Sequence, residues 1–144
     1  MIDNSAIVLF SGGQDSTVSL LWACKNFSHV ETIGFNYNQR HKIELECRIK
    51  IIKKIRNISI SYNNIIGEDH LIDMPSFGEI SETSLTRNSK IFIEENGLPN
   101  TFVPGRNLLF LIMASALGWR RNIFNFVGGM CDTDYSGYPD CRRN

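Results

Sequence analysis

The hydrophobic pattern of the first third of the chain predicts strands and helices in alternation. Residues 6–10 form an unbroken apolar run, which is typical of a strand buried on both faces. Residues 17–24 read as a helix, and residues 30–37 alternate between apolar and polar side chains as a second strand would. The chain therefore opens with a strand, a helix and a strand.

A second helix and a third strand are predicted to follow. Residues 42–55 carry apolar side chains at steps of four with charged residues between them, which predicts an amphipathic helix. Residues 58–62 are short and apolar enough for a third strand. Helical crossovers of this length give parallel strands with right-handed connections. The expected fold class is therefore α/β, a doubly wound parallel sheet.

The pattern is weakest in residues 63–100, where Pro75, Gly78, Gly97 and Pro99 indicate irregular backbone. A short helix near residues 66–72 is the only element expected there. An insertion of this length in a compact domain usually acts as a lid, a binding loop or a contact for a partner.

Periodicity returns in the last third of the chain. A helix is expected over residues 107–117, ending at Gly118, and Pro104 places Arg106 and Asn107 at its start. Residues 123–127 predict a fourth strand, which the pair Gly128-Gly129 should end.

Length and composition narrow the class of protein. The 144 residues suit a single domain, and 15 Lys and Arg balance 15 Asp and Glu, which does not favour nucleic acid or membrane as a partner. The basic residues among 48–56 are interpreted as the solvated face of a helix rather than an RNA-binding patch. The start of the chain lacks the basic region of a signal peptide, and residues 108–117 are too short to span a bilayer, so a cytoplasmic location is expected.

The chain has four cysteines, Cys24, Cys47, Cys131 and Cys141, without a Cys-x-x-Cys pair. In a reducing compartment we expect them to be free thiols, mostly buried, and not a zinc site.

The stretch between the first strand and the first helix, from Phe10 to Thr17, has the character of an anion site. Its sequence is Phe-Ser-Gly-Gly-Gln-Asp-Ser-Thr, and paired glycines at such a turn let the backbone approach a ligand closely. The helix start directs N–H groups and the positive end of its dipole at the turn, and Ser11 and Ser16 add hydroxyl donors. A pyrophosphate or oligophosphate would suit this site. The alternative is an ordinary turn with Asp15 or Ser16 as the helix cap.

Three other polar blocks are expected to follow strand ends or begin a helix beside them. These are Gln39-Arg40-His41, Arg106-Asn107 and residues 134–142. Ligands of doubly wound sheets bind beyond the carboxyl ends of the strands, so the blocks should meet at one edge. Each block has a structural alternative, since Arg106 could lie on the surface, Tyr135 and Tyr138 in the core, and Asp134 at a turn.

The Ser-Gly-Gly-Gln-Asp-Ser stretch resembles the pyrophosphate loop of the ATP pyrophosphatases. Three further blocks, Tyr-Asn-Gln-Arg-His, Phe-Val-Pro-Gly-Arg-Asn and Asp-Tyr-Ser-Gly-Tyr-Pro-Asp-Cys-Arg, make the chain similar to the 7-cyano-7-deazaguanine synthases from residue 6 to its end. The resemblance implies an adenine nucleotide α-hydrolase-like fold. It also implies a ligase of queuosine biosynthesis, which converts 7-carboxy-7-deazaguanine and ammonia to the nitrile with ATP and Mg²⁺ through an acyl adenylate.

The resemblance assigns roles by position. The nucleotide would be bound by Phe10, Ser11, Gly12, Gly13, Gln14, Asp15, Ser16 and Thr17. Arg40 and Arg106 would contact phosphate or carboxylate in catalysis, because a guanidinium binds such groups bidentately. The substrate pocket would include Asn107, Asp134, Tyr135, Asp140 and Arg142. The expected partners are these small molecules, with neither nucleic acid nor membrane, and a homodimer is allowed for.

The chain departs from this family at its C-terminus. Members continue past the Tyr-Pro-Asp-Cys-Arg block into more of the sheet and a four-cysteine zinc site, whereas here only Arg143 and Asn144 follow Arg142. Residues 1–144 are therefore expected to be one ATP pyrophosphatase domain, incomplete at the C-terminus and without the zinc ligands. Uncovered apolar surface would favour self-association.

Three interpretations remain open from the sequence. The chain is a fragment whose intact form is the ligase, a nucleotide-binding remnant without turnover, or another ATP pyrophosphatase such as a tRNA thiolase or an amidotransferase-coupled synthetase. The Asp-Tyr-Ser-Gly-Tyr-Pro block argues against the last, and thiolases usually need a reactive cysteine pair that is not recognisable here.

Overall fold

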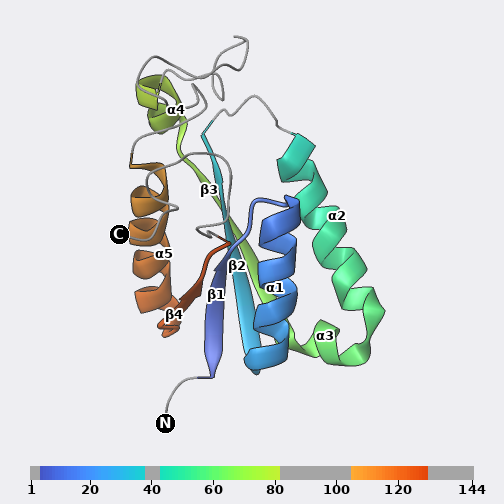
Figure 1. Ribbon diagram of the computed structural model, residues 1–144. Coiled ribbons are helices and arrows are strands. Elements are labelled where there is room, and N and C mark those ends of the chain that lie inside the picture. Colours follow the sequence, from blue (N-terminus) through green and yellow to red (C-terminus); the bar gives the residue numbers. More distant parts are fainter. Residues whose placement is uncertain (1–3, 38–42, 82–104, 130–144) are drawn as a thin grey trace, which may run out of the picture.

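The computed structural model describes residues 4–37, 43–81 and 105–129, and a parallel β-sheet lies at its centre (Figure 1). Its strands are β1 (Ser5–Leu9), β2 (His29–Asn36), β3 (Ile66–Asp73) and β4 (Asn125–Val127). Their order across the sheet is β3-β2-β1-β4, and every neighbouring pair is parallel. From β1 the chain adds β2 and β3 on one side and later adds β4 on the other side. This change of direction confirms the α/β, doubly wound arrangement.

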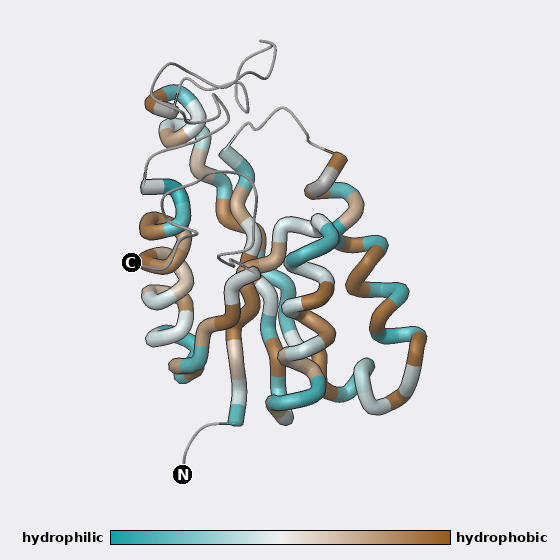
Figure 2. The backbone as a smooth tube through the Cα atoms, in the orientation of Figure 1, coloured by the Kyte–Doolittle hydropathy of each residue, from teal (hydrophilic) through white to brown (hydrophobic). Residues whose placement is uncertain are grey.

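Helices cover both faces of this sheet (Figure 1). On one face lie α1 (Gln14–Asn26), α2 (Ile43–Ile58) and the short α3 (Ile60–Ile65). The other face is covered by α5 (Arg106–Arg121), and α4 (Pro75–Ser81) follows the end of β3. Along α2, hydrophobic and hydrophilic positions alternate as one-sided burial requires (Figure 2).

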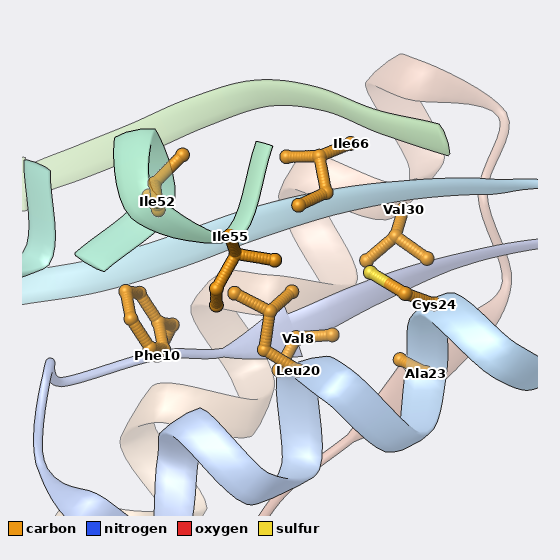
Figure 3. Close-up of a cluster of buried hydrophobic side chains, with 9 residues drawn as sticks. All are labelled: Val8, Phe10, Leu20, Ala23, Cys24, Val30, Ile52, Ile55 and Ile66. Atoms are coloured by element: carbon orange, nitrogen blue, oxygen red, sulfur yellow. The ribbon is translucent and has the colours of Figure 1, made fainter. Parts of the chain in front are cut away.

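Two apolar cores form because successive side chains of a strand point to opposite faces. On β2, Val30 packs toward α1 and α2, whereas Ile33 packs toward α5. The first core consists of Val8, Phe10, Leu20, Ala23, Cys24, Val30, Ile52, Ile55 and Ile66 (Figure 3). The second consists of Ile7, Ile33, Phe35, Tyr37, Ala114 and Ile123.

The third strand lies later in the chain than the sequence predicts. Residues 58–62 are not a strand, because α2 continues to Ile58 and the Ser59 side chain caps α3 by accepting a hydrogen bond from the Tyr62 N–H, at 3.2 Å. The strand is β3, where a short helix was expected. It is an edge strand that buries only Ile66 fully and exposes charged residues such as Glu68, and this hides its strand character.

The last helix is longer than predicted, because Gly118 does not end it. A Cβ at Gly118 would lie 2.4 Å from the carbonyl oxygen of Ile123 and 2.7 Å from Cζ of Phe126. This glycine therefore allows α5 to pack against the chain that enters β4. The helix ends at Arg121, and Asn122 supplies the left-handed cap at φ 58°.

Several large apolar side chains of α5 and the turn after it are exposed, among them Leu108, Ile112, Trp119 and Phe124. Trp119 and Phe124 meet edge to face, with ring centroids 6.3 Å apart. Within the described ranges, no helix combines the length and apolar character that crossing a membrane would require.

A buried ion cluster near the amino end of β2 joins β2, β3 and α5. Glu31 is 1% exposed and accepts hydrogen bonds from Arg121, at 2.6 Å from Nη2 and 3.0 Å from Nε. The Nε2 atoms of His70 and His29 lie 2.7 and 3.1 Å from the same carboxylate. Burial alone would raise the pKa of Glu31, but the hydrogen bonds from Arg121, His70 and His29 outweigh it and lower the pKa to about 2.

This lowered pKa predicts acid-sensitive stability. The contribution of Glu31 is fully present above a pH of about 4.5 and is lost as the pH falls toward about 2, because the unfolded state takes up the proton first. Its size is about 3 kcal/mol in the free energy of unfolding. Denaturant unfolding measured between pH 6 and pH 2 should show this loss, and Glu31→Gln should flatten it.

The matched control is Glu46→Gln, which replaces an exposed carboxylate on α2. If Glu31→Gln and Glu46→Gln gave the same dependence of stability on pH, the role of the buried cluster would be contradicted.

Candidate functional site

The turn between β1 and α1 has a backbone conformation that favours glycine at the first of its two glycine positions. Gly12 has φ 92°, in the left-handed region where a Cβ is strained, whereas Gly13 is extended at φ −80° and ψ 174°. Gly13 is the N-cap of α1, and no side chain caps it. The alternative interpretation, a cap by Asp15 or Ser16, is therefore wrong.

The hydroxyl groups of the turn converge on Gly13. The Ser11 hydroxyl accepts a hydrogen bond from the Gly13 N–H at 3.2 Å and lies 3.2 Å from the Ser16 hydroxyl. Ser16 and Thr17 donate to the Gly13 carbonyl oxygen at 3.0 and 2.8 Å. Ser11, Gln14 and Asp15 are exposed, so the turn presents a polar surface at the start of α1.

The chain that leaves β4 approaches this turn closely. A Cβ at Gly129 would lie 2.9 Å from the Ser19 hydroxyl and 3.3 Å from the Asp15 carbonyl oxygen. The strand ends at Val127, so the expectation that Gly128-Gly129 ends it is confirmed. The ends of β1 and β4 thus flank the first turn of α1.

An open groove of about 640 Å³ lies between α1 and β4. Aromatic side chains such as Trp22, Phe27 and Phe126 line it together with the polar Ser19 and Asn125. None of the described side chains that line the groove is cationic, so the glycine turn and not this groove is the candidate site for a polyphosphate.

Arg106 and Asn107 begin α5 at the sheet edge where the strands end (Figure 1). One turn further on, Phe110 stacks on Phe35 of β2, with ring centroids 4.1 Å apart. Tyr37 and Phe77 also contact Phe110, at 5.8 and 6.4 Å between centroids. This aromatic cluster fixes the start of α5 against the end of β2, and so brings Arg106 and Asn107 to the edge that carries the glycine turn.

Several predicted site residues lie outside the described part of the chain. These are Arg40, with Gln39 and His41, and the substrate-pocket candidates Asp134, Tyr135, Asp140 and Arg142. Their placement at the same edge remains a prediction.

The sequence interpretation missed Arg48, which was assigned to a solvated helix face. The residue is 1% exposed, and its Nη1 donates to the Phe10 carbonyl oxygen at 2.6 Å. Its Nη2 contacts the Asp69 carboxylate, which also accepts a hydrogen bond from the Thr32 hydroxyl at 2.6 Å. Burial lowers the pKa of Arg48, and the neighbouring Asp69 opposes that change.

Two signals in the sequence could have revealed this buried cation. Arg48 is in phase with Ile52 and Ile55, which are on the buried face of α2, whereas Lys53 and Lys54 are exposed. Gly34 lies inside the predicted second strand, and a glycine inside a strand often marks a close approach by another group.

In the described part of the chain, Cys24 and Cys47 are free thiols. Cys24 is buried, and burial raises its pKa to about 11. No three His, Cys, Asp or Glu side chains within residues 4–37, 43–81 and 105–129 are arranged to bind a metal. Cys131 and Cys141 lie outside the described residues.

Comparison with protein-family models gives one description for nearly the whole chain. The model of "Queuosine biosynthesis protein QueC" matches residues 5–144. The match supports the adenine nucleotide α-hydrolase-like class that the resemblance implies, and the parallel sheet is of the α/β type expected for it.

Curated relatives carry the name 7-cyano-7-deazaguanine synthase. The chain is 56% identical to that of Leptothrix cholodnii over 140 residues, which is 97% of this chain and 60% of the relative. It is 56% identical to one from Rhodopseudomonas palustris over 142 residues, covering 99% and 60% of the two chains. A relative from Nitrobacter hamburgensis is 55% identical over 141 residues, covering 98% and 59%. The chain thus spans about 60% of the length of these relatives.

The backbone of the turn predicts different outcomes for its two glycines. Gly12→Ala should reduce the free energy of unfolding by about 1–2 kcal/mol, because an L side chain is strained at its positive φ. Gly13→Ala should cost less, about 0.5–1 kcal/mol, because alanine is a poorer N-cap than glycine but its backbone is unstrained there and its Cβ would meet only the Ser11 hydroxyl, at 3.4 Å. Denaturant unfolding of both variants checks this, and equal losses would contradict the described backbone.

Proposed function

This chain belongs to the family of the queuosine biosynthesis protein QueC, and we propose that it is the ATP-binding part of a 7-cyano-7-deazaguanine synthase. In this proposal the protein that contains it is an ATP-dependent ligase, which converts 7-carboxy-7-deazaguanine and ammonia to the 7-cyano compound. The observation that carries the proposal is the glycine turn between β1 and α1, together with the family match over residues 5–144.

The turn suits a pyrophosphate group for three reasons. Gly12 and Gly13 place no Cβ of their own against an approaching ligand, the N-terminus of α1 favours negative charge, and the Ser11 and Ser16 hydroxyls lie 3.2 Å apart beside it. A triphosphate held there by its outer phosphates would leave its α-phosphorus accessible. Asp15, exposed in the first turn of α1, fits the oxygen preference of Mg²⁺, which would neutralise phosphate charge.

The chemistry proceeds in two activations. A carboxylate oxygen of the substrate attacks the α-phosphorus of ATP, which forms an acyl adenylate and releases pyrophosphate. Ammonia displaces AMP to give the amide. A second ATP adenylates the amide oxygen with release of pyrophosphate, and loss of AMP and a proton leaves the nitrile. Such steps need positioning and charge stabilisation more than a nucleophilic side chain.

Roles in the proposal follow the position of each residue. Arg106 opens α5 at the sheet edge that carries the turn, where its guanidinium would bind phosphate or carboxylate, and Asn107 would contact the substrate. Arg40 would act with Arg106. Asp134, Tyr135, Asp140 and Arg142 would complete the substrate pocket.

Other features expected of the whole protein remain proposals. They are a cytoplasmic location, a homodimer, and a zinc site built by a C-terminal segment beyond this chain. A second candidate function is nucleotide binding without turnover, for which the glycine turn alone would suffice.

Turnover separates the two candidates. The chain, and the natural protein that contains it at full length, should be incubated with 7-carboxy-7-deazaguanine, ATP, Mg²⁺ and ammonia, and AMP release measured by chromatography. We expect AMP from the full-length protein only when the deazaguanine is present. AMP formation that does not depend on the deazaguanine, or nucleotide binding without AMP, would reject the ligase for the protein tested.

Replacement of the arginines at the sheet edge tests their roles. Arg106→Ala and Arg142→Ala in the full-length protein should each lower kcat/KM by about 100-fold or more, because a charge-assisted contact to phosphate or carboxylate is lost. The control is Arg120→Ala, which replaces an exposed arginine at the other end of α5. It should leave kcat and KM unchanged. If Arg106→Ala and Arg142→Ala behaved as Arg120→Ala does, the assigned roles would be wrong.

A further inference from the structure

We infer that Arg48 is a positioning residue that fixes the glycine turn for phosphate binding. The inference rests on the proposed nucleotide site but adds a residue that lies outside it, on α2. Arg48 is a fully buried cation, and a buried charge persists only when it is paired and hydrogen-bonded. Its contacts therefore show what holds it there.

The guanidinium contacts residues of three neighbouring strands or of the chain directly after them. Nη1 donates to the carbonyl oxygen of Phe10, which follows β1, and Nη2 contacts Asp69 on β3. Between them lies Gly34 of β2, where a Cβ would be 1.1 Å from Nη1 and 2.3 Å from Cζ. The missing side chain at Gly34 is thus the passage by which Arg48 crosses β2 and reaches the chain that enters the turn.

Phe10 is the last residue before the turn, and both of its backbone groups are held. Its N–H donates to the Ile33 carbonyl oxygen at 2.8 Å, and its carbonyl oxygen accepts from Arg48. The Phe10 ring also packs against the guanidinium, with Cζ of Arg48 5.5 Å from the ring centroid. Phe10 therefore cannot rotate about the strand axis without breaking one of these contacts.

A fixed Phe10 carbonyl fixes the peptide group that begins the turn. In a planar trans peptide the C=O of one residue and the N–H of the next point in opposite directions. With the Phe10 carbonyl directed at Arg48, the Ser11 N–H is directed away from it, and the path into Gly12 and Gly13 is set. Asp69 balances the charge of Arg48, so the effect on a bound anion is mainly geometric.

Arg56 offers a matched control on the same helix. Its Nη2 donates to the carbonyl oxygen of Gly67 at 2.6 Å, at the start of β3 and away from the turn. Both arginines thus join α2 to a backbone carbonyl of the sheet, but only Arg48 does so beside the turn. Replacement of Arg56 reports the general effect of losing such a contact.

The test is nucleotide binding to the full-length protein, measured by calorimetry with Mg²⁺ and an ATP analogue that has a methylene group between the α- and β-phosphates. Arg48→Met should weaken binding of the analogue about tenfold or more, because the turn loses its anchor. Inorganic pyrophosphate should lose affinity by a similar factor, and adenosine should not. Arg56→Met should bind the analogue as the unchanged protein does.

Arg48→Lys keeps the charge but cannot span Phe10 and Asp69 together, so its affinity should fall between those of Arg48→Met and the unchanged protein. This variant keeps the test decisive if Arg48→Met fails to fold. Unchanged pyrophosphate affinity in a folded Arg48→Lys or Arg48→Met protein would overturn the inference. Equal losses for adenosine and pyrophosphate would do the same. Failure of the unchanged protein to bind the analogue would instead reject the proposed function.

Discussion

The fold and the site both depend on how a parallel sheet buries one positive charge. Arg48 lies in the apolar layer between α2 and the sheet, and its neighbours in phase on that helix are core isoleucines. The buried guanidinium is tolerated because the Asp69 carboxylate balances its charge and the Phe10 carbonyl oxygen accepts a hydrogen bond from it. The same contacts hold the point where β1 leaves the sheet, so the stability of the core and the shape of the turn have a common origin.

The sheet is stabilised by different contacts at the amino and carboxyl ends of its strands, called here its amino and carboxyl edges. At the amino edge, Glu31 gathers Arg121, His29 and His70 and so joins α5 to β2 and β3. At the carboxyl edge, aromatic rings from β2, α4 and α5 pack around Phe110, and the glycine turn opens beside them. Ionic contacts thus stabilise the side of the sheet near the amino ends of the strands. Aromatic packing stabilises the side at their carboxyl ends, where the polar groups of the turn can contact a ligand.

The sequence predicted the order of the first elements and the turn, because buried strands and glycine pairs have strong local signatures. It misplaced β3, since an edge strand with charged residues such as Glu68 and Asp69 lacks the apolar run of a buried strand. It also took Gly118 for a helix end, although the reason for that glycine is contact with Phe126, which no local pattern reveals. Arg48 was missed for a related reason, because its partners Phe10 and Asp69 are distant in sequence.

That distance has a consequence for biosynthesis. Phe10 and Arg48 are separated by 38 positions, and Asp69 comes 21 later, so the anchor is complete only after β3 has left the ribosome. A nascent chain that ends within α2 already contains every residue of the turn but none of its support from β3. Closing such long-range contacts is a slow part of folding. The capacity to hold an anion should therefore be acquired late, after the first helix has formed.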